Sequence, residues 1–117
     1  MATPSGRLAY VELSVADSEA SALFFEAAFG WNLTRFGPSY AGTLGAGTDI
    51  GLQGDPSEAT GAPLAGVEVN DLEAALKAVE AAGGVITRSI FVFPGGRRFH
   101  FREPGGNEMT VFVTEAH

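Results

Sequence analysis

The chain has 117 residues, a formal net charge of −7 and a pI near 4.6, and 45% of its residues are hydrophobic. This length and composition are ordinary for one globular domain with a buried core. The acidic balance argues against a nucleic-acid partner, because phosphate binding needs clustered Lys and Arg. The sequence has no cysteine, which excludes a disulfide framework, a thiolate metal site and a cysteine nucleophile.

The N-terminal residues and the hydropathy of the chain indicate where in the cell the protein is expected. Residues 1–6 contain neither a basic start nor an apolar run, so we expect no signal peptide. No apolar stretch approaches the roughly 18 residues of a spanning helix, so we expect no membrane partner. These expectations together predict a cytoplasmic protein.

The first predicted strand covers residues 8–15, where apolar and mixed positions alternate as in a half-buried strand. Asp17 stands at the N-cap of the following helix, and Gly30 stands where a left-handed residue ends it. Ala22, Phe25 and Phe29 recur at helical spacing and predict its buried stripe. Three further strands are predicted over residues 31–36, 39–44 and 48–53.

Residues 54–63 have the composition of a connector, and the same order then recurs. A strand over residues 65–69 precedes Asp71 as the cap of a second helix, which Gly83 and Gly84 end. Strands follow over residues 85–93, 97–102 and 108–113, separated by turns at 94–96 and 103–107. Each half therefore reads strand, helix and three strands.

The second half also repeats the first in sequence. Residues 15–30 read VADSEASALFFEAAFG, and residues 69–84, an offset of 54, read VNDLEAALKAVEAAGG. Eight of these sixteen positions are identical without a gap. Similar composition explains the Ala and Glu matches, but not the common register of the Val, the capping Asp and the final Gly. The repeat indicates a duplicated unit, with one module at about 7–54 and another at about 63–114 of a single domain covering 1–117.

Four stretches carry a resemblance to a known family: VELSVAD at 11–17, FF and FGW at 24–25 and 29–31, VEVND at 67–71, and REPGGN at 102–107. In their order and spacing they resemble the vicinal oxygen chelate superfamily of glyoxalases, bleomycin-resistance proteins and extradiol dioxygenases. The resemblance covers essentially the whole chain. It implies an α+β fold in which two βαβββ modules form curled mixed sheets around a cavity. It also implies a homodimer, in some members with exchanged modules.

The resemblance further implies where metal ligands would stand. The family's first-strand His falls at Tyr10, its counterpart in the second module at Leu64, and its last-strand Glu at Thr110. The remaining ligand, on the fourth strand, has Asp49 and Gln53 as candidates. A catalytic divalent ion needs about three protein ligands, and Leu, neutral Tyr and Thr do not supply them. We therefore expect no metal, no cofactor, and no metal-dependent glyoxalase or dioxygenase chemistry.

Strand alternation assigns the cavity face. The expected residues are Leu8, Tyr10, Glu12 and Ser14 from the first strand, Leu64, Gly66 and Glu68 from the fifth, and Glu108, Thr110 and Phe112 from the last. Glu12 stands out as a carboxylate halfway along a core strand. It is either a general base or cation-binding group, or it pairs with Arg98 or Arg102 and holds the sheet together. Glu108 is expected to be a solvated charge at the rim.

The strand at 97–102 has a polar face and an aromatic face. If Arg98, His100 and Arg102 line the cavity, His100 is the best proton-transfer residue available. If Phe99 and Phe101 line it instead, they form an aromatic floor; sequence alone leaves both open. The other histidine, His117, ends the sequence and is expected to fray.

Trp31 and Tyr40 are candidate stacking surfaces for a flat ligand, with ordinary core packing as the alternative. The prediction is a metal-free small-molecule-binding protein of the glyoxalase/bleomycin-resistance type that sequesters an antibiotic-like or aromatic compound. Its predicted ligand-binding residues are Tyr10, Glu12, Trp31, Tyr40, Arg98, His100, Thr110 and Phe112. The alternatives are a metal-free lyase or isomerase with Glu12 or His100 as catalytic acid or base, a metal-dependent enzyme with unusual ligands, and a dimeric scaffold.

Overall fold

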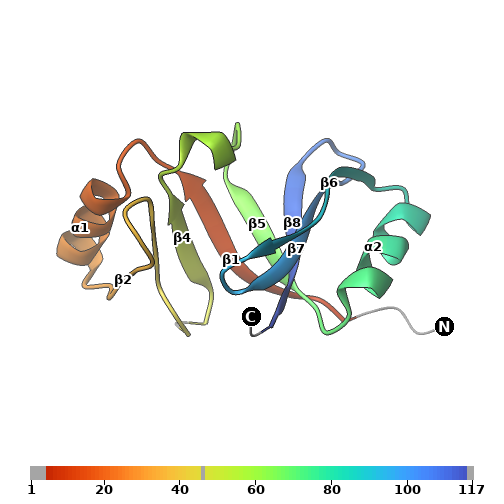
Figure 1. The fold of residues 1–117 in the computed structure, drawn as a ribbon, viewed down its shortest axis with the longest axis horizontal. Coiled ribbons are helices and arrows are strands. Elements are labelled where there is room, and N and C mark those ends of the chain that lie inside the picture. The colour runs from red at the N-terminus through yellow and green to blue at the C-terminus, as the bar shows by residue number, and fades with distance from the viewer. Residues whose placement is uncertain (1–4, 46, 116–117) are drawn as a thin grey trace. The chain divides into compact units, whose positions relative to one another are not determined.

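A computed structural model describes residues 5–45 and 47–115. The expectations for the first four residues and for His117 lie outside this part. The described elements are β1 (Arg7–Ser14), α1 (Ser18–Phe29), β2 (Thr34–Arg35), β3 (Tyr40–Gly42), β4 (Asp49–Gln53), the 3-10 turn η1 (Pro56–Glu58), β5 (Leu64–Glu68), α2 (Leu72–Ala81), β6 (Val85–Phe93), β7 (Gly96–Arg102) and β8 (Glu108–Thr114), shown in Figure 1. Neither described helix has the length and apolarity that crossing a membrane requires.

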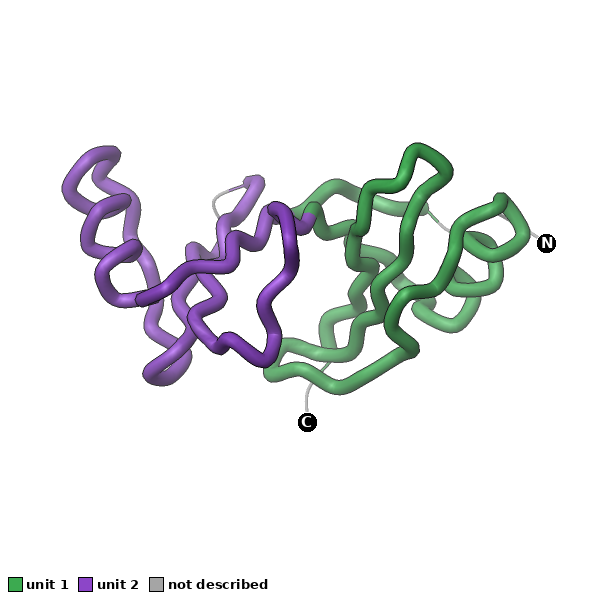
Figure 2. Tube along the Cα trace, turned by 90° about the horizontal axis from the view of Figure 1, so that it is seen from above, with its two compact units in different colours: residues 1–9, 65–117 green, residues 10–64 purple. Residues whose placement is uncertain are grey.

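The chain forms two compact units, coloured separately in Figure 2. Unit 2 is residues 10–64, and unit 1 is residues 1–9 with 65–117. Within unit 2 the strand order is β2-β3-β4-β1, and within unit 1 it is β6-β7-β8-β5. In both, the last two strands listed are parallel and the other neighbours antiparallel. The predicted α+β fold of two βαβββ modules with mixed sheets is confirmed.

The two helices begin at the same position of the repeat, because the same residue type caps them. The Asp17 carboxylate accepts from the backbone N–H groups of Glu19 at 3.0 Å and Ala20 at 3.2 Å. The Asp71 carboxylate accepts from the N–H of Ala74 at 3.0 Å. Each cap satisfies N–H groups that have no partner inside the helix. Both predicted caps are confirmed.

The helix ends differ between the copies. Gly30 closes α1 in the left-handed conformation, with φ of 70°. In α2 the left-handed residue is Gly83, with φ of 101°, so the helix ends at the predicted Gly83-Gly84 pair, but one position earlier than the repeat aligns with Gly30. Gly84 is needed for another reason: a Cβ there would lie 2.6 Å from Cγ1 of Val79. Its glycine permits a close approach of chain and helix.

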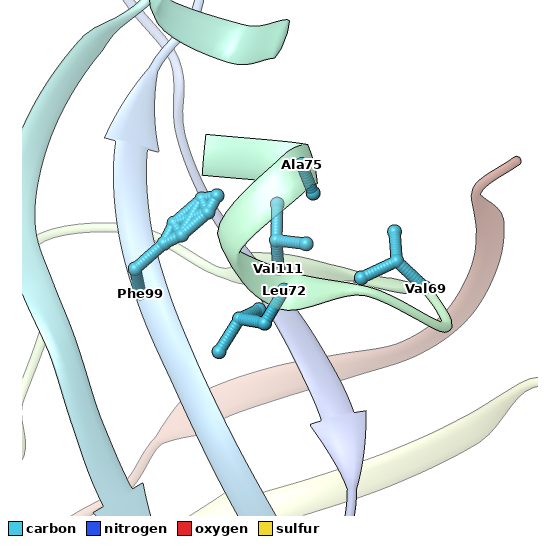
Figure 3. Packing of buried hydrophobic residues seen from close by; sticks show 5 residues of the cluster. All are labelled: Val69, Leu72, Ala75, Phe99 and Val111. Atoms are coloured by element: carbon cyan, nitrogen blue, oxygen red, sulfur yellow. The ribbon is translucent and has the colours of Figure 1, made fainter. Parts of the chain in front are cut away.

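Each unit has its own hydrophobic core. In unit 1, α2 packs on its sheet through Val69, Leu72, Ala75, Phe99 and Val111 (Figure 3). In unit 2, α1 packs on its sheet through Ala22, Leu33, Ala41 and Leu52, with Leu13, Val15, Phe25 and Ile50 partly buried around them. Burying one such large side chain contributes about 1.5–3 kcal/mol. These contacts fix which face of each sheet is covered by a helix.

Two sequence expectations around the end of α1 are wrong. The sequence predicted a buried Phe29, but this residue is 62% exposed. It is the last residue of α1, and its ring packs on Phe25 and Trp31. The strand expected over residues 31–36 is reduced to the two residues of β2. The backbone N–H of Leu33 donates to the Glu26 carboxylate at 3.2 Å. In a longer β2, this N–H group would instead be available to hydrogen-bond with the adjacent strand.

Candidate functional site

In both units, the polar residues predicted for a site lie on the sheet face opposite the helix. In unit 2, Leu52 and Ala41 pack under α1, so the neighbouring positions Gly51 and Tyr40 face the other way. In unit 1, Phe99 and Phe101 pack with the core under α2. The direction of β7, which the sequence left open, is thereby resolved: Arg98 and His100 lie on the helix-free face.

Glu12 is the central group on the helix-free face of unit 2. It is buried, with 2% of its surface exposed, and its Oε1 accepts a hydrogen bond from the Tyr40 hydroxyl at 3.0 Å. Hydrogen bonds to a charged group are among the stronger ones and fix the carboxylate in position. The sequence predicted Tyr40 as a stacking surface and missed this role.

Gly51 makes room for that hydrogen bond. It is the register partner of Glu12 in the β1–β4 ladder. A Cβ at Gly51 would lie only 2.1 Å from the Tyr40 hydroxyl oxygen and 3.0 Å from Cζ of the same ring. The phenol of Tyr40 therefore occupies the space in which a side chain at position 51 would stand. A glycine inside a predicted strand was the available sequence signal for such a close approach.

Strand register locates the fourth family ligand position. Gly66, which is 54 residues after Glu12, pairs with Thr110, whereas Glu12 pairs with Gly51. The counterpart of Thr110 in the first copy is therefore Gly51, and the candidates Asp49 and Gln53 were wrong. Asp49 instead accepts from the Thr43 hydroxyl at 2.8 Å. The Gln53 side chain accepts from the backbone of Asp55 at 3.0 Å.

The residues at these four positions do not fit the family's metal. Gly51 has no side chain, and Leu64 is an aliphatic residue with 1% exposure. The hydroxyl of fully buried Thr110 donates to the carbonyl of Phe99 at 3.1 Å. Tyr10 offers only a phenol, so the set contains no carboxylate or imidazole. Across residues 5–45 and 47–115, no group of three acidic or His side chains is arranged to hold an ion.

His100 is the candidate proton-transfer group of unit 1. It is 5% exposed, and its Nδ1 lies 3.7 Å from Oε2 of Glu108, which is longer than a hydrogen bond. The same oxygen accepts from the Thr87 hydroxyl at 2.7 Å. Glu108 begins β8 and has a side-chain exposure of 27%, so it is half-buried and only partly the solvated rim charge that the sequence predicted.

Arg98 lies among aromatic rings on the same face. The guanidinium carbon is 5.2 Å from the ring centre of Phe91 and 5.3 Å from that of Phe93, which are cation–π distances. Phe112 meets Phe93 edge to face, with ring centres 6.4 Å apart. Arg102, the other arginine weighed for Glu12, is exposed and donates to the carbonyl of Gly106 at 2.9 Å.

Trp31 lies apart from these groups, on the α1 side of unit 2. Its indole stacks on Phe25, with ring centres 5.2 Å apart. Trp31 and Tyr40 therefore face opposite sides of one sheet and do not stack on the same ligand. The remaining predicted ligand-binding residues of unit 2, Tyr10 and Glu12, share the helix-free side with Tyr40.

Comparison with solved structures gives neighbours of the same fold. A methylmalonyl-CoA epimerase from Mycobacterium tuberculosis has a TM-score of 0.76 at 17% identity, covering 93% of this chain and 88% of that one. A protein described as an NAD-dependent benzaldehyde dehydrogenase from Legionella pneumophila has a TM-score of 0.76 at 14% identity, covering 95% and 100%. Homoprotocatechuate 2,3-dioxygenase from Brevibacterium fuscum has a TM-score of 0.70 at 18% identity, covering 98% of this chain but 39% of its own.

Identities this low show the fold alone. No curated protein sequence matches the chain significantly. A family model does match, over residues 7–111, and it describes the Glyoxalase/Bleomycin resistance protein/Dioxygenase superfamily. This match runs from the first residue of β1 into β8 and so covers most of both modules. The chain therefore belongs to the glyoxalase/bleomycin resistance protein/dioxygenase superfamily.

Proposed function

We propose that the protein binds a small organic molecule without a metal, on the helix-free face of unit 2 around Glu12 and Tyr40. The observation that carries this proposal is the buried carboxylate held by a phenol above Gly51, where the family would place a metal ligand. A buried, oriented carboxylate favours a positively charged or hydrogen-bond-donating ligand. The proposed ligand is an aromatic or antibiotic-like cation.

Two further properties support a sequestering role. The family name includes bleomycin resistance proteins, and bleomycins are cationic glycopeptides. The net charge of −7 raises the local concentration of cations near the protein. A binder of this kind lowers the free concentration of a toxic compound and needs no catalytic step.

The test uses EDTA-treated protein in thermal-shift and calorimetric titrations with a bleomycin and a panel of aromatic amines. A ligand at about 100 times its Kd adds roughly 2.7 kcal/mol of stability, which raises Tm by several degrees. Glu12→Gln should weaken binding about tenfold or more, corresponding to roughly 1.4 kcal/mol. Tyr40→Phe keeps the Glu12 carboxylate, so it should weaken ligand binding less than Glu12→Gln does.

Glu68→Gln is the matched control. It removes one carboxylate from the chain as Glu12→Gln does, but Glu68 is ion-paired with Arg7 at 2.7 Å and its side chain is 33% exposed. Circular dichroism of each variant establishes that it folds. If Glu12→Gln and Glu68→Gln weaken ligand binding equally, the overall charge of the protein explains the effect and Glu12 has no specific role. If no compound of the panel stabilises the protein, the proposal is refuted.

A second candidate is a metal-free acid–base enzyme. The same 3.0 Å contact places a carboxylate that can act as a general base beside a phenol that can donate a hydrogen bond. One solved neighbour is an epimerase by its name, and epimerisation moves a proton. The test is proton-to-deuterium exchange in 2-substituted thioesters, followed by NMR in heavy water. Exchange that Glu12→Gln abolishes supports the enzyme, and its absence with the unmodified protein counts against it.

We also propose a homodimer in the cytoplasm, as family members of this size suggest. Light scattering coupled to size-exclusion chromatography tests the assembly, because the 12.1 kDa chain would elute as a species of about 24 kDa. A mass of one chain at micromolar concentration would contradict the dimer.

A further inference from the structure

Unit 2 contains a cavity between the residues that follow α1 and the start of β4. Its volume is about 490 Å³, within the range of small-molecule sites. The residues that line it are Val11, Trp31, Asn32, Thr43, Leu44, Thr48, Asp49 and Ile50. Since all of them belong to residues 10–64, the cavity is complete within one compact unit.

Trp31 provides a fixed flat wall. Its indole stacks on Phe25 at an interplanar angle of 10°, and Phe29 packs on it with ring centres 5.3 Å apart. These contacts hold one side of the ring while 40% of the residue stays exposed. An aromatic wall that is already held in place loses little conformational entropy when a second ring stacks on it.

The fold does not require this aromatic wall, as the duplication shows. Fifty-four residues after Trp31 the second copy has Val85, and Phe29 corresponds to Gly83. Unit 1 folds with the same strand order without either ring. The aromatic residues at the end of α1 are therefore specific to the first copy and not part of the shared scaffold.

The lining also has a charge preference. It contains the Asp49 carboxylate and no Lys, Arg or His. The Thr43 hydroxyl donates to Asp49 at 2.8 Å and the backbone N–H of Gly45 donates at 3.2 Å, so the carboxylate is held in place. Val11, Leu44 and Ile50 supply apolar surface beside it. Apolar walls, one indole and one carboxylate match a ring system that carries a positive charge.

We infer that this cavity is a binding site for a planar aromatic cation, stacked on Trp31 with its charge toward Asp49. The site is separate from the one under Proposed function, because neither Glu12 nor Tyr40 is among the residues that line it. It needs neither Glu12 nor Tyr40.

Three probes with one ring system test the inference: 2-naphthylmethylammonium, the neutral 2-naphthylmethanol and the anionic 2-naphthylacetate. Trp31 is the only tryptophan, so its indole N–H gives one assignable NMR signal in labelled protein. The ammonium probe should shift that signal and bind at least tenfold more tightly than the other two. Absence of any shift at millimolar probe, or equal affinity for all three, would overturn the inference.

Variants locate the site. Trp31→Val installs the residue type of the second copy and should lower affinity at least tenfold, measured by calorimetry. Leu44→Lys adds a positive charge at a wall residue that is 68% exposed, so it should repel the ammonium probe without disturbing the core. Val92→Lys is its matched control, an aliphatic residue that is 65% exposed in unit 1. Equal losses in the two Lys variants would contradict the site.

Discussion

Replacing Gly51 by Ala should separate Tyr40 from Glu12. The new Cβ would lie 2.1 Å from the Tyr40 hydroxyl oxygen, far inside van der Waals contact. Gly51 lies in β4 between its neighbouring strands, so its backbone is held and the phenol is the part that moves. The displaced hydroxyl no longer donates to a carboxylate that has only 2% exposure.

The magnitude follows from two opposing terms. A hydrogen bond to a charged group contributes about 1.5–3 kcal/mol to stability. A Gly→Ala change without strain stabilises by about 0.4–1 kcal/mol, because the unfolded chain loses freedom. Gly51→Ala should therefore lower the free energy of unfolding by about 0.5–2.6 kcal/mol.

Urea denaturation of four proteins measures this: the unmodified chain, Gly51→Ala, Tyr40→Phe and the double variant. In the Tyr40→Phe background no hydrogen bond remains to be lost, so the alanine should cost less there. Gly61→Ala is the control, because a Cβ at Gly61 meets nothing within 4 Å. The reasoning would be refuted if Gly51→Ala left the free energy of unfolding unchanged. It would also be refuted if Gly51→Ala lowered that free energy equally with Tyr and with Phe at position 40.

The remaining predictions concern the core and acid stability. Phe99→Ala should destabilise by about 3–5 kcal/mol in urea denaturation, because Phe99 is fully buried in the core of unit 1. Hydrogen bonds from Arg35 lower the pKa of the Glu19 and Glu26 carboxyls below 4.5. A lowered folded-state pKa gives stability that is present above 4.5 and lost as pH falls through the folded values. The free energy of unfolding should therefore drop below pH 4.5, and Arg35→Met should flatten that drop in denaturation curves between pH 7 and pH 3.

The fold was predictable where local rules decide it. Asp17 and Asp71 act through N–H groups two or three residues away, so sequence spacing is enough to place them. Strand β6 was predicted with both of its ends, because β-favouring residues predominate from Val85 to Phe93 and Gly84 and Pro94 bound them. The short β2 was not, because its neighbour Leu33 bonds to Glu26 on α1, a tertiary contact that periodicity does not contain.

The sheet face on which candidate residues lie was predictable in part, whereas their hydrogen-bond partners were not. Alternation placed Glu12 and Tyr10 on one face correctly, since period two is a property of the strand itself. The Tyr40–Glu12 hydrogen bond spans 28 positions of the chain and depends on Gly51, a third residue whose contribution is the absence of a side chain. The separation of Trp31 from Tyr40 likewise depends on which side of the sheet α1 covers.

The duplication separates scaffold from function more sharply than either copy alone. Positions that agree between the copies, such as Asp17 with Asp71, cap helices and serve the fold. Where the helix-free faces differ, the differences are chemical: Glu12 corresponds to Gly66, and Gly51 to Thr110. Both copies have the same strand order although they carry different residues at these positions. The fold therefore does not require a particular residue type there. Because the buried carboxylate of Glu12 has only a glycine at the matching position of the other copy, Glu12 is the first residue at which to test for a ligand.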